Sequence, residues 1–205
     1  MVKAVIFDIG GGLMDFQTHA LTAAFAENDA DARLLHQEFF DAPDWVAMDR
    51  GMPEEQVLSA ICSRLPLRLQ AAAEKLLADW DRYLIPKPET ETLAAELHRL
   101  GFPLYILSNT SSRFYRFRDR IAPWPLMSGA ILSFEEKLQK PDPEIFRRMF
   151  SRFGLAPGDC FFIDDSRMNV EAARWCGIQA FQYRDDISQL RRALRQAGVP
   201  VAAES

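Results

Sequence analysis

Three short apolar runs in this chain each stop abruptly at polar side chains, and this pattern restricts the fold more than any other feature. The runs and their ends are Ala4–Phe7 before Asp8, Pro103–Leu107 before Ser108-Asn109, and Cys160–Ile163 before Asp164-Asp165. Runs that are apolar at every position predict strands buried on both faces, as in a parallel sheet. We therefore expect these strands to lie inside one sheet.

Helical patterns separate the predicted strands. The clearest has Asp142 as N-cap, Pro143 at the first helical position, an apolar stripe at helical spacing, and Gly154 as its end. Further helices are expected near 89–100, 111–120, 169–176 and 186–196, and further strands near 130–132 and 179–183. Alternating strands and helices predict an α/β fold: a Rossmann-like parallel sheet with helices on both faces.

The segment between about residues 18 and 83 differs from the rest, because it contains helical spacing but no convincing strand. Pro43, Gly51-Met52-Pro53 and Pro66 divide it into roughly four helices. We expect a helical-bundle cap at 15–87, inserted into a core made of 1–14 and 88–205. Trp45, Asp49 and Arg50 fall between cap helices, where they either face the core or pack within the cap.

The net charge of −5 argues against a nucleic-acid partner, and no apolar run is long enough to predict a membrane span. Three cysteines without paired spacing favour a reduced, cytoplasmic protein. We expect a monomer or a homodimer. The arginines of two segments are expected to form solvated helix faces. They are Arg113, Arg116, Arg118 and Arg120, and Arg191, Arg192 and Arg195.

The polar strand ends are the candidate functional residues. Ligands of open parallel sheets bind beyond the carboxyl ends of the strands, so Asp8, Ser108 and Asp164-Asp165 should lie near one another. Lys140, just before a helix, can add one positive charge. This combination suits phosphoryl transfer, with an aspartate as the nucleophile and other carboxylates holding Mg²⁺. The expected partner is a small phosphorylated metabolite.

Four segments in this order resemble the motifs of the haloacid dehalogenase superfamily. They are Phe-Asp-Ile-Gly-Gly-Gly-Leu-Met-Asp, Leu-Ser-Asn, Lys-Pro-Asp-Pro-Glu-Ile-Phe and Phe-Phe-Ile-Asp-Asp-Ser-Arg-Met-Asn. The resemblance covers the whole chain, including a helical cap of the C1 type after the first motif.

By this resemblance, Asp8 is the nucleophile, Ser108 and Lys140 assist it, and Asp165 binds Mg²⁺ directly. Asp164 binds the metal through water or orients the site, Gly10 offers its carbonyl oxygen, and Asn169 supports the metal loop. The expected substrate-binding residues are Ser108, Asn109, Lys140 and Gly11.

Gly10 is a departure from the pattern, because phosphatases of the superfamily carry a second aspartate two residues after the nucleophile. That acid protonates the leaving oxygen, a contribution of about 10²–10⁴-fold. Its loss favours substrates with acidic leaving groups, and the loop resembles the branch that includes glucose-1-phosphate phosphatases. The alternatives are a catalytically weak phosphate-binding protein and a 2-haloacid dehalogenase. Dehalogenases of the superfamily need no metal and lack the paired acids of the last motif, so Asp164-Asp165 favours metal and phosphate.

Overall fold

The computed structural model describes residues 1–203 and places the three apolar runs side by side in one parallel sheet. The strands are β1 (Ala4–Phe7), β4 (Leu104–Ser108), β5 (Met127–Leu132), β6 (Cys160–Asp164) and β7 (Gln179–Gln182), in the order β5-β4-β1-β6-β7. β1 lies at the centre, with Val5 opposite both Leu104 and Phe161. The predicted α/β fold is confirmed, and the ends of β1, β4 and β6 reach the same edge.

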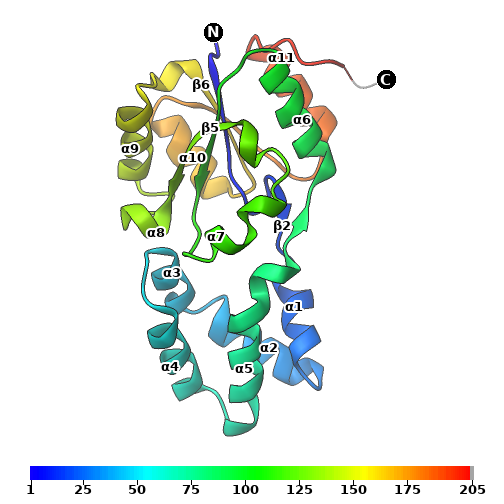
Figure 1. Ribbon diagram of the computed structural model, residues 1–205, viewed down its shortest axis with the longest axis vertical. Coiled ribbons are helices and arrows are strands. Elements are labelled where there is room, and N and C mark those ends of the chain that lie inside the picture. The colour runs from blue at the N-terminus through cyan, green and yellow to red at the C-terminus, as the bar shows by residue number, and fades with distance from the viewer. Residues whose placement is uncertain (204–205) are drawn as a thin grey trace.

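Two apolar layers cover the sheet because alternate residues of β1 point to opposite faces. Val5 and Phe7 belong to one buried cluster, and Ala4 and Ile6 belong to the other. Helices α6 (Pro88–Arg99) and α11 (Ile187–Gln196) pack on the first face, and α9 (Pro143–Phe153) and α10 (Arg167–Trp175) cover the second (Figure 1). The sheet is therefore buried on both sides, as the uninterrupted apolar runs predict.

The helix ends follow the local sequence signals. The Asp142 side chain accepts a hydrogen bond from the Glu144 amide, and Gly154 ends α9 in the left-handed conformation. The predicted helix at 111–120 is broken up instead: α7 covers only Phe114–Phe117. Short elements complete the core, namely α8 (Ser133–Glu136) and the 3-10 turns Arg118–Arg120, Trp124–Leu126 and Pro157–Asp159.

A helical insertion follows β1 and lies below the carboxyl edge of the sheet (Figure 1). It contains five α-helices rather than the four expected: α1 (Thr18–Phe25), α2 (Asp29–Phe39), α3 (Pro43–Asp49), α4 (Glu54–Arg64) and α5 (Leu67–Asp79), followed by the 3-10 turn Trp80–Tyr83. Two short antiparallel strands, β2 (Met14–Asp15) and β3 (Ile85–Pro86), pair where the chain leaves and re-enters the core. The sequence missed both strands because two residues are too few to show alternation. The limits of cap and core at 14/15 and 87/88 stay a prediction.

Two arginines depart from the predicted solvated faces. The guanidinium of Arg113 is buried and pairs with Glu54 of α4 and with Asp81, at 2.6 and 3.0 Å. Arg191 is also buried, with its Nη1 2.6 Å from Glu96. Opposite charges on segments distant in sequence bury these arginines, which helical spacing alone could not show.

Over residues 1–203, no helix combines the length and the apolar character that crossing a membrane requires. The predicted cytoplasmic location stays a prediction.

Candidate active site

Asp8 is the first residue after β1, and its carboxylate is nearly buried at the centre of the carboxyl edge, with 7% of the residue exposed. Oδ1 accepts a hydrogen bond from the Ile9 amide at 2.7 Å and lies 2.8 Å from Nζ of Lys140. A central strand in a parallel sheet thus delivers one carboxylate to the edge where ligands bind.

Lys140 joins the ends of two strands. Its fully buried ammonium lies 2.6 Å from Oδ2 of Asp164 as well as 2.8 Å from Asp8. Burial alone would favour the neutral amine, but the charges of Asp164 and Asp8 outweigh this and raise the pKa of Lys140. The ammonium therefore stays charged between two carboxylates.

The side chain of Asn109 fixes the backbone of Lys140. Its Nδ2 donates to the Lys140 carbonyl at 2.9 Å, and its Oδ1 accepts from the Lys140 amide at 2.8 Å. The amide group predicted to bind substrate is thus engaged with Lys140. The two hydrogen bonds of the Asn109 side chain fit a role in positioning Lys140. Asn109 also lines a small cavity described below.

Three carboxylates gather beside the lysine. One oxygen from each of Asp8, Asp164 and Asp165 lies within 4.8 Å of the others. Burial raises the pKa of Asp8 to about 7, opposed by Lys140 and reinforced by Asp164. Burial and the charge of Asp164 likewise raise the pKa of Asp165. Both raised pKa values come chiefly from burial, and the neighbouring carboxylates add to the effect of burial against the opposing charge of Lys140.

The two acids after β6 have different surroundings. Asp164 is fully buried and accepts hydrogen bonds from the Ser166 amide at 2.8 Å and from Nδ2 of Asn169 at 3.1 Å, besides its contact with Lys140. Asp165 is exposed. The oxygens of Asp164 are therefore largely engaged, whereas Asp165 is open to a ligand; the separate roles that the family resemblance implies for them stay a prediction.

The glycine-rich loop after β1 lets the backbone approach these acids closely. Gly11 adopts φ +71°, and a Cβ atom there would lie 2.2 Å from Cγ of Asp165. A Cβ on Gly12 would lie 2.3 Å from the Asp8 carbonyl oxygen. Only glycine fits these two positions. A Cβ on Gly10, in contrast, would meet nothing within 4 Å.

A small cavity of about 70 Å³ lies between the insertion and the core, beside Ser108. Its core side includes Ile9, Gly10, Asn109 and Thr110, and the remaining lining residues are Phe16, Trp45, Asp49, Trp80, Leu84 and Phe117. Trp45 and Asp49, named from the sequence as candidates, do face this cavity; Arg50 does not line it. The other aromatic residues gave no sequence signal because they come from distant segments.

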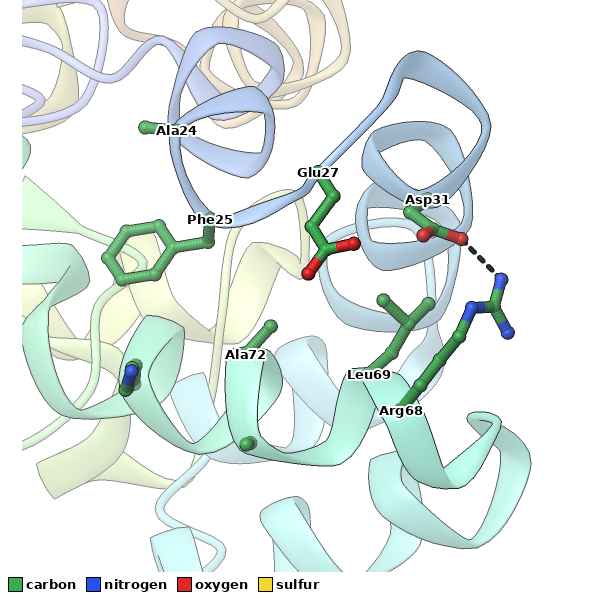
Figure 2. A pocket seen from close by; sticks show the side chains of 9 residues that line it. Ala24, Phe25, Glu27, Asp31, Arg68, Leu69 and Ala72 are labelled. Atoms are coloured by element: carbon green, nitrogen blue, oxygen red, sulfur yellow. Dashed lines mark hydrogen bonds and ion pairs between the residues drawn. The ribbon is translucent and has the colours of Figure 1, made fainter.

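A second hollow, of about 430 Å³, lies within the helical insertion between α1, α2 and α5. Figure 2 shows Phe25 and Glu27 on one side, Leu69 and Ala72 on the other, and an ion pair between Asp31 and Arg68 at its end. It is the more spacious of the two, but none of the predicted site residues lines it. We place the functional site at the strand ends because the charged cluster is there.

Fold and site together define an α/β enzyme with an acidic centre at the carboxyl edge of a parallel sheet. The chain belongs to the haloacid dehalogenase-like hydrolase family, whose sequence profile matches residues 2–177. The predicted superfamily is thereby confirmed, and the chain is a hydrolase. Its resemblance to the glucose-1-phosphate phosphatase branch stays a prediction.

Individual relatives carry several activities. Protein CbbY of Cupriavidus necator is 28% identical, over 86% of this chain and 76% of its own length. The D-ribitol-5-phosphate phosphatase of Bacteroides thetaiotaomicron is 24% identical, over 89% of this chain and 92% of its own. A solved HAD family enzyme of B. thetaiotaomicron, in complex with magnesium and inorganic phosphate, superposes with a TM-score of 0.72 at 22% identity, covering 93% and 99% of the two chains.

Dehalogenases share the fold as well. The L-2-haloacid dehalogenase of Xanthobacter autotrophicus, with chloropropionic acid covalently bound, gives a TM-score of 0.66 at 20% identity, over 98% of this chain and 85% of its own. The overall fold therefore does not distinguish the two chemistries, and the distinction rests on the site residues.

Proposed function

We propose that this hydrolase is a Mg²⁺-dependent phosphatase that acts on a small phosphate monoester through an aspartyl-phosphate on Asp8. The observation that carries the proposal is the cluster of Asp8, Asp164 and Asp165 within 4.8 Å, next to the buried ammonium of Lys140. Three carboxylates beside one lysine offer oxygen ligands to a further cation, and a bound cation in turn attracts an anionic substrate.

The donor set fits magnesium. Mg²⁺ prefers oxygen ligands, and one or two carboxylates usually hold it together with water and substrate phosphate. Asp8 and Asp165 would bind it directly, Asp164 would bind through water or orient the others, and the Gly10 carbonyl would add a further oxygen. Bound at this place, the metal supplies the charge neutralisation that lets a carboxylate approach a phosphate group.

Residues of the chain carry out nucleophilic attack and bind the phosphoryl group. Asp8 attacks phosphorus, the bond to the leaving oxygen breaks, and water then hydrolyses the aspartyl-phosphate. Lys140 orients the Asp8 carboxylate through its 2.8 Å contact with Oδ1 and offsets charge on the phosphoryl group. Ser108 lines the cavity, and within residues 1–203 its hydroxyl makes a single long hydrogen bond of 3.4 Å, to the Asn109 carbonyl, so it is available to donate to a phosphoryl oxygen.

The paired acids also weigh against a dehalogenase, since that chemistry needs no metal. A haloacid carries its own carboxylate, which the charges of Asp164 and Asp165 would repel unless a cation neutralised them. The surplus negative charge therefore favours the phosphate reaction, and halide release from a 2-haloacid in EDTA is the result that would favour the other.

The cavity favours a small leaving group with a flat or apolar face. Trp45 and Trp80 have ring centroids 5.1 Å apart, and Phe16 lies within 6.0 Å of both rings. The indole N–H of Trp80 is buried and has no hydrogen-bond partner among the described residues. These faces suit an aryl group or the apolar face of a sugar ring.

Release of inorganic phosphate tests the proposal. Aryl phosphates, alkyl phosphates and sugar phosphates are compared with Mg²⁺ and with EDTA, and halide release from 2-haloacids is measured in parallel. We expect Mg²⁺-dependent phosphate release that Asp8→Asn abolishes while circular dichroism shows an intact fold. Folded protein that binds Mg²⁺ and phosphate but turns over no substrate would support the weak phosphate-binding alternative instead.

A further inference from the structure

The loop after β1 provides no proton donor for the leaving group, because Gly10 stands where a second acid would be expected. Gly10 lines the cavity beside Ser108, so the vacancy opens toward the place where a substrate would lie. Among the described residues that line this cavity, Asp49 is the one with a carboxyl group, and it comes from the end of α3 in the inserted segment.

The backbone of Asp49 is fixed against the core. Its carbonyl accepts a hydrogen bond from Oγ of Ser133 at 2.6 Å, and the same hydroxyl accepts from the Thr110 amide at 2.9 Å. One serine thus joins the end of α3 to the loops that follow β4 and β5. Figure 1 shows α3 next to α8, which begins at Ser133.

The turn at Gly51, two residues further on, also lies close to the backbone of the core. Gly51 adopts φ +90°, and a Cβ there would lie 2.9 Å from the Phe134 carbonyl oxygen. A residue held between these two contacts has little freedom to move away from the cavity. The contact between the insertion and the core therefore fixes the position of Asp49.

The carboxyl group of Asp49 is not used for structure. No hydrogen bond or ion pair engages it within residues 1–203, although most other partly buried acids of the insertion are paired. Burial raises the pKa of Asp49 to about 7; the charge of Asp8 adds to this, and Lys140 opposes it. An acid that titrates near neutrality can both give and accept a proton during turnover.

We propose that Asp49 is the general acid and base of the reaction, supplied by the inserted segment in place of the side chain missing at Gly10. This role rests on the proposed phosphatase function. As Asp8 attacks and the P–O bond breaks, the Asp49 carboxyl gives its proton to the leaving oxygen. The Asp49 carboxylate then takes a proton from the water that attacks phosphorus, the bond to Asp8 breaks, and phosphate leaves with Asp49 protonated again.

The test compares kcat/KM of Asp49→Asn with that of the wild type, for phosphates whose leaving groups differ in acidity. Because kcat/KM reports the steps up to release of the leaving group, loss of a proton donor must depend on that group. We expect a loss of about 10²–10⁴-fold for an alkyl phosphate and less than about tenfold for 4-nitrophenyl phosphate. With the nitrophenyl ester, slow hydrolysis of the aspartyl-phosphate should give a burst of nitrophenol.

A second variant separates chemistry from structure. Gly10→Asp places a carboxyl group in the vacant position, where a Cβ meets nothing within 4 Å. In the Asp49→Asn background it should restore at least part of the loss on the alkyl phosphate. Asp29→Asn, which changes an exposed acid of α2 outside the cavity, is the matched control and should leave kcat/KM unchanged.

The outcomes are distinguishable. An equal loss on all leaving groups, or no loss, would overturn the role of Asp49 while leaving the phosphatase function intact. Absence of turnover in the wild type would instead contradict the phosphatase function itself.

Discussion

The ammonium of Lys140 lies 2.8 Å from Oδ1 of Asp8, and both groups are buried. The same ammonium contacts Asp164, so one cation separates two carboxylates that would otherwise repel each other. This relationship gives Lys140 a structural role in addition to the catalytic role proposed above, and the structural role should depend on pH through the ionisation of Asp8.

Lys140→Met should lower the free energy of unfolding by about 3–5 kcal/mol at pH 8 in EDTA, because it leaves two buried carboxylates without the cation that neutralises them. The loss should be smaller at pH 5, since the raised pKa of Asp8 lets that carboxyl take up a proton and become neutral. Urea denaturation at both pH values measures this. The same loss at both would mean that packing, not charge, is what the lysine contributes.

Mg²⁺ should stabilise the folded state by linkage, by about 2.7 kcal/mol at 100 times its dissociation constant. Asp165→Asn should weaken this response, because it removes the carboxylate of the cluster that is open to solvent. Thermal unfolding across a Mg²⁺ titration provides the measurement. Asp119→Asn, an exposed acid outside the cluster, is the control, and an equal response in both variants would exclude Asp165 from the metal site.

Adjacent glycines should respond oppositely to alanine. Gly11→Ala strains a left-handed backbone and drives a methyl group into Asp165, whereas Gly10→Ala meets open space. We expect Gly11→Ala to lower the free energy of unfolding by about 1–3 kcal/mol and to weaken Mg²⁺ binding. Gly10→Ala should keep the wild-type Tm. Equal Tm values for the two variants would contradict the close approach of the loop to Asp165.

Arg113 joins the core to the insertion, since its guanidinium contacts Glu54 twice at 2.6 Å and Asp81 at 3.0 Å. Arg113→Met should cost about 3–5 kcal/mol, because Asp81 stays buried with a weaker partner. It should also raise KM, since Trp80, the neighbour of Asp81 in sequence, lines the cavity. Arg116→Met removes an exposed arginine 3.4 Å from the same Asp81 and should cost at most about 1 kcal/mol. Urea denaturation and steady-state kinetics of Arg113→Met and Arg116→Met measure these differences in stability and in KM.

Asp49 should destabilise the folded state at neutral and alkaline pH. Its pKa is about 7 when folded and 3.8 in the reference state, so the folded protein holds the extra proton between these values. Stability therefore falls as pH rises through this window, by up to about 4 kcal/mol at 1.4 kcal/mol per pKa unit, and is constant above it.

Asp49→Asn lacks this titration. In EDTA, its free energy of unfolding should exceed that of the wild type at pH 8, and the difference should shrink steadily toward pH 4. A difference that does not change with pH would show that Asp49 ionises as freely in the folded protein as in the unfolded chain.

The order of residues along the chain was enough to predict the sheet and the edge where its polar residues gather. Each apolar run is uninterrupted because its strand is buried on both faces, and each stops at a polar residue because the chain there reaches the ligand-binding edge. Asp8, Ser108 and Asp164 could therefore be identified by position, and the N-cap at Asp142 by local hydrogen bonding. Local signals such as these act within one element, which is why they can be read from the order of residues.

The surroundings of those residues depend on contacts between segments that are far apart in the sequence, and they became visible in the folded protein. Asn109 engages Lys140 across 31 positions, Arg113 is buried by acids from the insertion, and Asp49 reaches a cavity whose core side begins at Ile9. These contacts depend on how the insertion packs over the edge of the sheet. The residues that make them do not recur at regular intervals along the chain, so no sequence pattern indicates which side chains they bury. The sequence showed that an acid is missing at Gly10, and the closed cap–core contact places Asp49 beside the vacancy.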